Sequence, residues 1–128
     1  MSATPAPCPC GGGNYVACCG RYHDGAPAPD AATLMRSRYS AYVLKLESYL
    51  LATWHPGTRP AALDLAADDT TWIALEVRQH QLDSERHATV EFVARYKTGG
   101  RAQRLHETSH FVREDGRWLY VDGEIIAG

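Results

Sequence analysis

The sequence predicts an α+β fold in which one long N-terminal helix packs on an antiparallel sheet of about four strands, preceded by a small cysteine-rich segment. Apolar residues recur at helical spacing from Asp30 to about His55, and the period changes to two from Trp72 onward. A chain of 128 residues is long enough for one hydrophobic core of this kind and too short for two of usual size. We therefore expect one domain with an appendage.

Composition and charge exclude several classes of function. The formal net charge of -2 gives no surplus of Lys and Arg, which argues against broad binding to nucleic acid or anionic membranes. No apolar run approaches the roughly 18 residues that span a bilayer. Residues 1–7 lack the basic and apolar regions of a signal peptide. These observations predict a cytoplasmic protein.

Four cysteines form two close pairs near the start of the chain. Cys8 and Cys10 are one residue apart, Cys18 and Cys19 are adjacent, and glycines at 11–13 lie between the pairs. Glycine reaches the positive-φ conformations that a tight loop needs, so four sulfurs can converge on a tetrahedron. Thiolate sulfurs favour zinc, and four protein ligands leave no open position. The spacing therefore predicts a structural Zn²⁺ ligated by all four cysteines.

Three other interpretations of these cysteines stay open. Two disulfides are one, since four cysteines allow three connectivities, of which pairing each cysteine with its near neighbour closes strained rings. An iron–sulfur site is the second. In the third, His23 replaces one cysteine as a metal ligand.

Residues 20–30 are a predicted linker, because glycine and proline interrupt any periodic pattern there. The long helix follows, with Asp30 as its N-cap and an end near His55, since Pro56 and Gly57 cannot continue it. A second, short helix is expected around Ala61–Ala67. The buried stripe of the long helix consists of Met35, Tyr39, Tyr42, Leu46, Tyr49 and Leu50.

Period-two alternation then predicts the strands. In the first strand Ile73, Leu75 and Val77 share one face. The second covers residues 87–97, and Gly99-Gly100 supplies the hairpin turn after it. Another turn at Glu114-Asp115-Gly116 precedes the last strand, Trp118–Val121. One face of the second strand carries Val90, Phe92, Ala94 and Tyr96.

The third strand places a carboxylate among apolar neighbours, because Leu105, Glu107, Ser109 and Phe111 share one face. If this face is concave, Glu107 points into a cavity, where desolvation makes it a candidate acid or base. The alternative is a structural carboxylate paired with an arginine, such as Arg36, Arg38 or Arg95. His55 at the helix end is the second catalytic candidate.

The order Cys-Pro-Cys-Gly, a Gly-rich loop with a tyrosine, and Cys-Cys-Gly resembles the SEC-C zinc motif, although the loop has seven residues where that motif usually has eight. The segments 34–42, 53–56 and 118–123 resemble the YchJ-like family of small bacterial proteins. The resemblance implies a SEC-C-like zinc-binding segment and linker at 1–29. It also implies a cone-shaped domain with a curved sheet, similar to nuclear transport factor 2 (NTF2), at 30–128. SecB or the ribosome as partner, and a homodimer, are further implications.

Two classes of function follow. The first is a module with a structural zinc knuckle that binds a protein partner or a small ligand. The second, implied by the domain resemblance, is a small-molecule isomerase or dehydratase that uses Glu107 or His55 in a cavity of roughly 300 Å³ or more. The candidate pocket residues are Arg36, Tyr39, Tyr42, Trp54, Glu107, Ser109, Phe111 and Tyr120.

Overall fold

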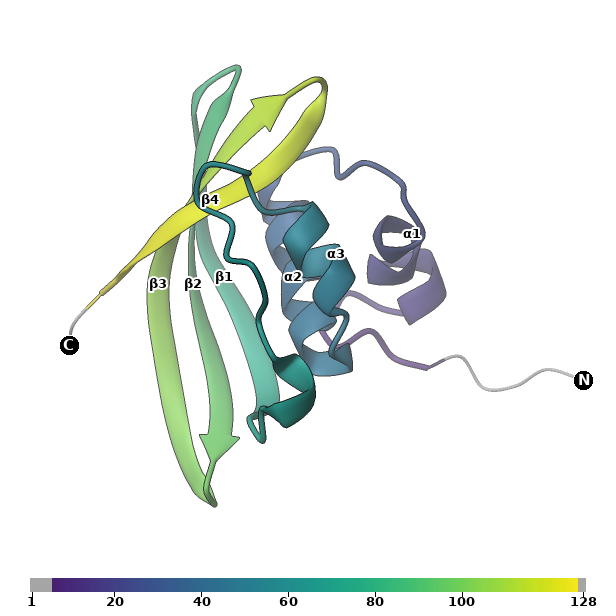
Figure 1. Cartoon of the computed structure of the whole chain (residues 1–128), viewed down its shortest axis with the longest axis vertical. Helices are drawn as coiled ribbons and strands as arrows, with labels where there is room; N and C mark the ends of the chain where they lie inside the picture. The colour runs from purple at the N-terminus through teal and green to yellow at the C-terminus, as the bar shows by residue number, and fades with distance from the viewer. Residues whose placement is uncertain (1–5, 127–128) are drawn as a thin grey trace, which may run out of the picture.

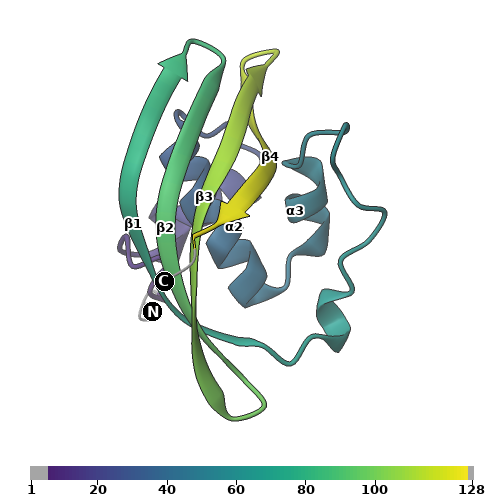
Figure 2. The same cartoon turned by 90° about the vertical axis from the view of Figure 1, so that its left-hand side faces the viewer.

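The computed structural model describes residues 6–126, which form a four-stranded antiparallel sheet with helices on one of its faces (Figure 1, Figure 2). The strands follow one another in the order β1-β2-β3-β4. The elements are a 3-10 turn at Tyr15–Ala17, α1 (Cys19–His23), α2 (Ala31–Leu44), α3 (Glu47–Ala52), a 3-10 turn at Leu65–Ala67, β1 (Thr71–Ser84), β2 (His87–Thr98), β3 (Arg101–Glu114) and β4 (Arg117–Ile125).

The hairpin turns confirm the predicted chemistry. Gly99 and Gly100 both have positive φ, as do Asp115 and Gly116, which is the backbone conformation that tight two-residue hairpins require. Residues 90, 92 and 94 of β2 are buried toward the helices, as their alternation predicts. The two glycine hairpins and the inward face of β2 therefore follow from the sequence pattern.

The predicted inward face of β1 is wrong at Ile73, whose side chain is 50% exposed. The pairing of β1 with β2 skips Ile73 between Trp72 and Ala74, which marks a β-bulge. A bulge adds one residue to one strand and reverses the alternation beyond it. Trp72 consequently takes the inward position and packs against the rings of Tyr39 and Tyr42 on α2.

The prediction of a single long helix is also wrong, because the helical region divides into α2 and α3. Lys45 adopts a left-handed conformation with φ 58°, and the N–H of Leu46 donates to the carbonyl of Ala41 at 2.8 Å. This six-to-one bond is the Schellman arrangement that ends a helix. The break turns Leu46 toward a small apolar cluster around Leu50 and Leu65, which stabilises it.

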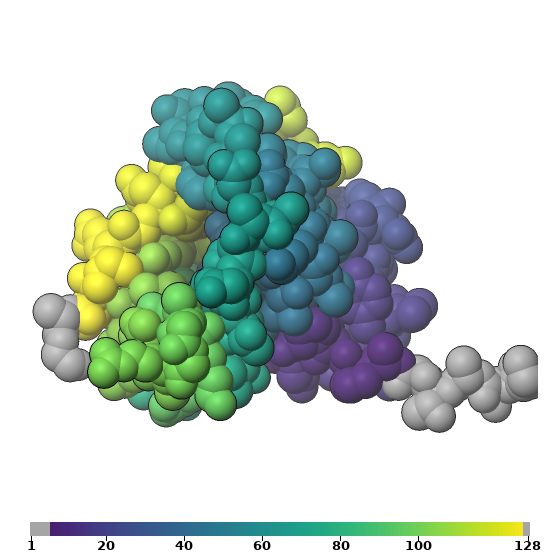
Figure 3. All heavy atoms as spheres, turned by 60° about the horizontal axis from the view of Figure 1, so that its bottom comes forward, coloured from purple at the N-terminus to yellow at the C-terminus, as the bar shows by residue number. Residues whose placement is uncertain are grey.

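The segment between α3 and β1 crosses one end of the molecule between the sheet and the helices (Figure 3). The short helix predicted around 61–67 is reduced to the 3-10 turn at Leu65–Ala67. Nearer to α3, Trp54 forms a parallel bridge with Tyr120 of β4. This bridge ties the end of α3 to the sheet.

Helix α2 lies at the centre of three layers, with the sheet on one side and the cysteine segment on the other (Figure 1). The main core includes Leu34, Met35 and Tyr39 from α2, with Val90 and Phe111 from the sheet. Cys8, Cys10 and Cys19 belong to the same core. None of the helices within residues 6–126 has the length and apolar character needed to cross a membrane.

Candidate metal centre and cavity

A short hairpin presents the first cysteine pair. Pro7 and Asn14 form an antiparallel bridge, and the N–H of Cys8 donates to the carbonyl of Gly13 at 2.7 Å. Gly11 and Gly13 have φ values of 85° and 115°, which residues with a side chain rarely adopt. The glycines predicted to shape the loop therefore do so. The 3-10 turn and the start of α1 supply the second pair.

The four cysteine sulfurs lie within 4.8 Å of one another. Sulfurs at about 2.3 Å from a tetrahedral zinc are separated by about 3.8 Å, so this cluster encloses one ion with little adjustment. The sulfurs of Cys10 and Cys18 are 3.5 Å apart, well beyond the roughly 2.05 Å of a disulfide. All four residues are free cysteines in the described chain. The structure therefore contradicts the disulfide interpretation.

The surroundings of the sulfurs fit a metal ion. A Cβ at Gly12 would lie 2.8 Å from the sulfur of Cys18 and 3.2 Å from that of Cys10, so only glycine leaves them room. On the opposite side, the buried Ser40 of α2 donates to the sulfur of Cys19 at 3.2 Å and lies 3.5 Å from that of Cys8. Hydroxyl donors to thiolates are typical of the outer shell of metal sites.

The electrostatics of the cluster also favour a cation. Hydrogen bonds, that from Cys19 above all, lower the pKa of Cys10 to about 5, against the effect of burial. Burial and then the hydrogen bond with Cys10 raise the pKa of Cys18 to about 11. The hydrogen bond with Cys10 and burial raise the pKa of Cys19 as well. Metal binding requires deprotonated thiols, so a cation among these sulfurs would offset the effects that raise the pKa of Cys18 and Cys19.

His23 is not part of the sulfur cluster, which contradicts the interpretation in which it replaces a cysteine as a metal ligand. Its Nε2 lies 2.8 Å from the carbonyl of Ser37, and its Nδ1 lies 2.6 Å from the hydroxyl of Tyr15. Because the carbonyl only accepts, Nε2 carries the proton and Nδ1 accepts from the tyrosine. The ring also contacts Tyr49 edge-on at 4.7 Å. His23 therefore fastens α1 to α2 and α3.

A cavity of about 220 Å³ lies between α2 and the sheet. Its walls are largely apolar and aromatic, and its polar groups come from α2, β3 and β4. The volume is smaller than the roughly 300 Å³ that we expected for an enzyme cavity, which is also the lower end of the range for a drug-sized ligand. The lining residues are Met35, Arg38, Tyr39, Tyr42, Trp72, Phe92, Ala94, Leu105, Glu107, Ser109 and Tyr120.

Arg38 is the buried cation of this cavity, with 3% of its surface exposed. Its Nη1 donates to the carbonyl of Leu50 at 2.8 Å and to the hydroxyl of Thr53 at 2.7 Å. The guanidinium carbon lies 5.1 Å from the ring centroid of Trp54 and 4.6 Å from that of Tyr120. Burial lowers the pKa of Arg38, although a guanidinium stays charged at neutral pH.

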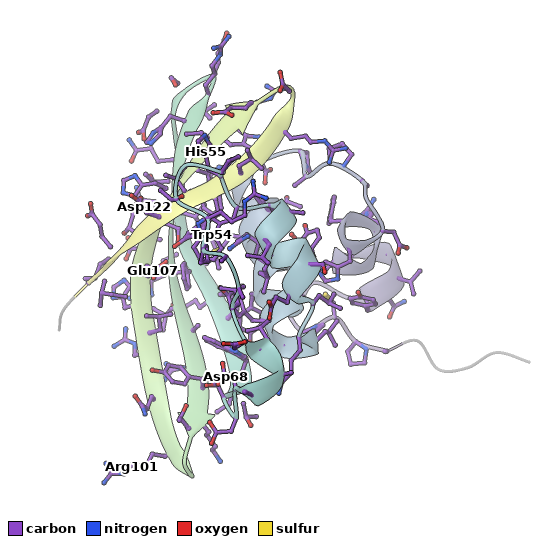
Figure 4. All side chains as sticks on the ribbon, viewed as in Figure 1. Trp54, His55, Asp68, Arg101, Glu107 and Asp122 are labelled. Carbon is purple, nitrogen blue, oxygen red and sulfur yellow. The ribbon has the colours of Figure 1, made fainter. Side chains whose placement is uncertain are left out.

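Glu107 supplies the opposite charge (Figure 4). One carboxylate oxygen accepts a hydrogen bond from the buried hydroxyl of Ser109 at 2.7 Å. The carboxylate lies over Gly123 of β4, where a Cβ would overlap it. Burial raises the pKa of Tyr120, and the negative charge of Glu107 raises it further, whereas the positive charge of Arg38 opposes the rise. The two charges and the phenol therefore act on one another inside one space.

The structure brings together five of the eight predicted pocket residues, which are Tyr39, Tyr42, Glu107, Ser109 and Tyr120. The other three lie elsewhere. Arg36 lies on an outer face of α2, beside Cys18 and beside Val77 of β1. Phe111 is fully buried against Tyr120, and Trp54 lies behind that ring and the guanidinium of Arg38.

His55 lies outside the cavity, in the loop that follows α3 (Figure 4). Its Nε2 is 2.8 Å from a carboxylate oxygen of Glu114, and its Nδ1 accepts from the N–H of Gly57 at 2.9 Å. Both nitrogens are thus engaged at the surface. The geometry gives His55 a loop-stabilising role and no access to Glu107.

The predicted pocket residues left out Arg38, which was expected only as a possible partner of Glu107, and Trp72, although both line the cavity. Arg38 lies three residues after Met35 and four before Tyr42, so helical spacing already places it on the buried stripe of α2. A charged residue on such a stripe is the signal that could have found it. Trp72 had no comparable signal, because its inward direction depends on the β-bulge.

A second recess, of about 340 Å³, lies between α1, the segment 25–28, α3 and β4. It is larger than the cavity between α2 and the sheet. Its polar side chains include Arg117, which is exposed, and His23, which already has partners at both nitrogens. We assign no chemistry to this recess.

Fold and site together define a class of small α+β proteins in which an NTF2-like domain follows four cysteines that could hold a metal ion. Residues 30–123 match the family described as YchJ, middle NTF2-like domain. The chain therefore belongs to the YchJ-like family, which confirms the resemblance read from its sequence.

Relatives and solved structures agree with this assignment. A UPF0225 protein of Chromobacterium violaceum is 64% identical over 124 residues, with 92% of each chain covered. The UPF0225 protein of Methylibium petroleiphilum is 61% identical, with 94% of this chain and 90% of the relative covered.

Two solved structures of SEC-C motif containing proteins share the fold. One from Rhodopseudomonas palustris has a TM-score of 0.83 at 34% identity, covering 95% of this chain and 100% of that chain. The other, from Psychrobacter arcticus, has a TM-score of 0.75 at 34% identity, covering 100% of this chain and 78% of that chain.

Proposed function

We propose that this YchJ-like protein is a cytoplasmic binding module for a small molecule, held in shape by a structural Zn²⁺ on Cys8, Cys10, Cys18 and Cys19. One observation carries the binding function. The cavity combines aromatic walls with a buried Arg38 and a Glu107 that do not pair with each other within 4.0 Å. Ligand sites have this composition, an apolar lining with a few converging polar groups.

Zinc is the ion that this donor set favours, since soft thiolates in a closed set of four select it over hard cations. When bound, the ion would supply charge neutralisation and a cross-link between the hairpin and α1, without an open position for water or substrate. Ser40 would donate to the thiolate of Cys19 and so join the metal site to α2.

Native mass spectrometry tests the zinc site on protein purified under reducing conditions, with and without chelator. We expect one zinc per chain and its loss in Cys18→Ser. His110→Gln, which changes a histidine on β3, is the matched control and should keep the metal. A metal-free chain lighter by four protons would mean two disulfides and would overturn the zinc proposal.

A fragment screen followed by NMR tests the cavity. A ligand in the cavity should shift the indole signal of Trp72 and leave that of Trp118, which lies outside the cavity lining. Leu105→Phe fills the cavity and should weaken binding, whereas Leu82→Phe on the exposed end of β1 should not. Binding that shifts both indoles equally, or survives Leu105→Phe, would exclude the cavity as the site.

A protein partner is the second candidate function, and Val16 favours it. This apolar side chain lies between the cysteine pairs and is 78% exposed. The SEC-C resemblance proposes SecB or the ribosome as the partner, and the NTF2-like fold proposes a second copy of the chain. Co-sedimentation with SecB and with ribosomes, comparing Val16→Ser with the unchanged protein, tests this role. Equal sedimentation of both proteins would exclude the exposed valine as the contact.

An isomerase or dehydratase is the third candidate, favoured by Glu107 with Tyr120 and Arg38 at one cavity. A carboxylate in that position could move a proton on a bound ligand. Incubation of any cavity ligand with the protein in D₂O, followed by NMR, would detect exchange of a carbon-bound hydrogen. Exchange should disappear in Glu107→Gln, which keeps an acceptor for Ser109. Ligand binding without hydrogen exchange would exclude the isomerase or dehydratase function and leave the binding function.

A further inference from the structure

The cavity holds two opposite charges that are kept apart. Among the ion pairs of residues 6–126, none involves Arg38 or Glu107. A buried charge without a counter-ion is costly, and a protein commonly neutralises such a group by pairing it. Arg38 is buried and Glu107 is partly buried, and within the described chain neither has an ion-pair partner in the cavity of about 220 Å³. These two charges therefore indicate which groups a ligand would bring.

Arg38 is fixed with part of its hydrogen-bonding capacity left over. Nη1 is used by Leu50 and Thr53, and the two ring contacts hold the plane of the guanidinium. Within residues 6–126 no hydrogen bond of comparable geometry leaves Nε or Nη2. Tyr42 interacts with the guanidinium, since burial raises the pKa of Tyr42 while the charge of Arg38 and a hydrogen bond with it oppose the rise. The cavity that Arg38 lines is where these donors can find an acceptor.

Glu107, the second charged group of the cavity, accepts hydrogen bonds. Ser109 donates to one of its carboxylate oxygens, and within residues 6–126 the other oxygen has no hydrogen-bond partner. Gly123 leaves room for the carboxylate, so its position is set by Ser109 of its own strand and by β4. A ligand bound here would therefore need a donor, either a hydroxyl or an ammonium group.

The walls between these two groups are aromatic. Tyr39, Tyr42 and Phe92 line the cavity, with Trp72 set edge-on to Tyr39. Such walls suit a flat apolar body. A simple organic cation is disfavoured because Arg38 already supplies a cation between aromatic rings, and a simple anion is disfavoured because Glu107 repels it.

We infer that the cavity takes a small organic carboxylate with a flat apolar body that also carries a hydroxyl or ammonium donor. The carboxylate would bind the free edge of Arg38, and the donor would bind Glu107. This inference rests on the proposed function, since it names the ligand class of the same cavity.

Four single-ring probes separate the two contacts: 3-hydroxybenzoate, 4-hydroxybenzoate, benzoate and 4-hydroxybenzamide. Titration of the zinc-loaded protein, followed by NMR at the Trp72 indole, gives the affinity of each. At least one hydroxybenzoate should bind about tenfold or more tighter than benzoate and hydroxybenzamide, because each of these lacks one hydrogen bond to a charged group.

Glu107→Gln should reduce the preference for hydroxybenzoate over benzoate, and Arg38→Gln should remove the preference for carboxylate over amide. Arg38→Gln also loses the bonds to Leu50 and Thr53, so its fold is checked by the ¹H–¹⁵N spectrum, and Glu107→Gln keeps the inference testable if that variant unfolds. Tighter binding of hydroxybenzamide, or preferences unchanged in Glu107→Gln, would overturn the ligand class and leave the binding function intact. If none of the probes and no compound of the fragment screen moves the Trp72 signal, both proposals fail.

Discussion

Gly123 of β4 is the position at which one added methyl group tests the geometry of the cavity. It pairs with Ser109 across the sheet, and a Cβ built on it overlaps the carboxylate of Glu107. Gly123 is not among the glycines with positive φ, so alanine itself is compatible with the backbone. The effect of Gly123→Ala therefore comes from the displacement of Glu107.

The magnitude follows from the contacts that this displacement breaks. Glu107 would lose the 2.7 Å hydrogen bond from Ser109, whose side chain is 1% exposed and would keep no acceptor. A hydrogen bond to a charged group contributes about 1.5 to 3 kcal/mol, and replacing glycine by alanine returns about 0.4 to 1 kcal/mol through the unfolded chain. We expect a net loss of about 0.5 to 2.5 kcal/mol in the free energy of unfolding.

Urea unfolding followed by tryptophan fluorescence measures this loss, and the same substitution in a Glu107→Ala background is the control. Without the carboxylate the methyl group meets no obstacle, so Gly123→Ala should be neutral or stabilising there. The coupling between the two sites should be about 2 kcal/mol. Equal losses in both backgrounds would refute the overlap and the position assigned to Glu107.

Three further predictions concern the cysteine segment. Ser40→Ala should lower the metal affinity about tenfold, measured by competition with a chromophoric chelator, because Cys19 loses its hydroxyl donor; unchanged affinity would separate α2 from the metal site. His23→Phe should keep one metal per chain in native mass spectrometry and lower the free energy of unfolding by about 1 to 2 kcal/mol, whereas loss of the metal would make His23 a ligand. Chelation should speed amide exchange in residues 6–29 and leave β2 and β3 protected, and a uniform increase would contradict an independent sheet core.

Most of the sheet and the cysteine cluster could be predicted because their signals are local. Alternation and the glycine turns determine β2 to β4, and the loop between the cysteine pairs needs only its glycines to close. The division of the helix could not be predicted in this way. Lys45 enters the left-handed region without being Gly or Asn, because Leu46 packs in a cluster with Leu50 and with Leu65, which is distant in sequence.

The cavity was predictable only where its residues have a local sequence signal. Glu107 and Ser109 follow from the alternation of β3, and Tyr39 and Tyr42 from the period of α2. Trp72 depends on a bulge in the pairing of β1 with β2, and Arg38 depends on tertiary partners at Leu50, Thr53 and Trp54. A polar residue whose partners lie on other elements has no local signal beyond its unusual position on a buried stripe.

Helix α2 connects the two sites, which explains why they occur together. Ser37 and Ser40 contact His23 and the cysteine sulfurs, whereas Arg38 and Tyr39 line the cavity. The side chains of α2 toward the cysteine segment include the small polar Ser37 and Ser40, while Cys8, Cys10 and Cys19 of that segment belong to the main core. A metal ion on the four cysteines would fix this short segment without requiring a larger core. Because α2 carries both Ser40 and Arg38, we expect metal removal to weaken ligand binding before it unfolds the sheet.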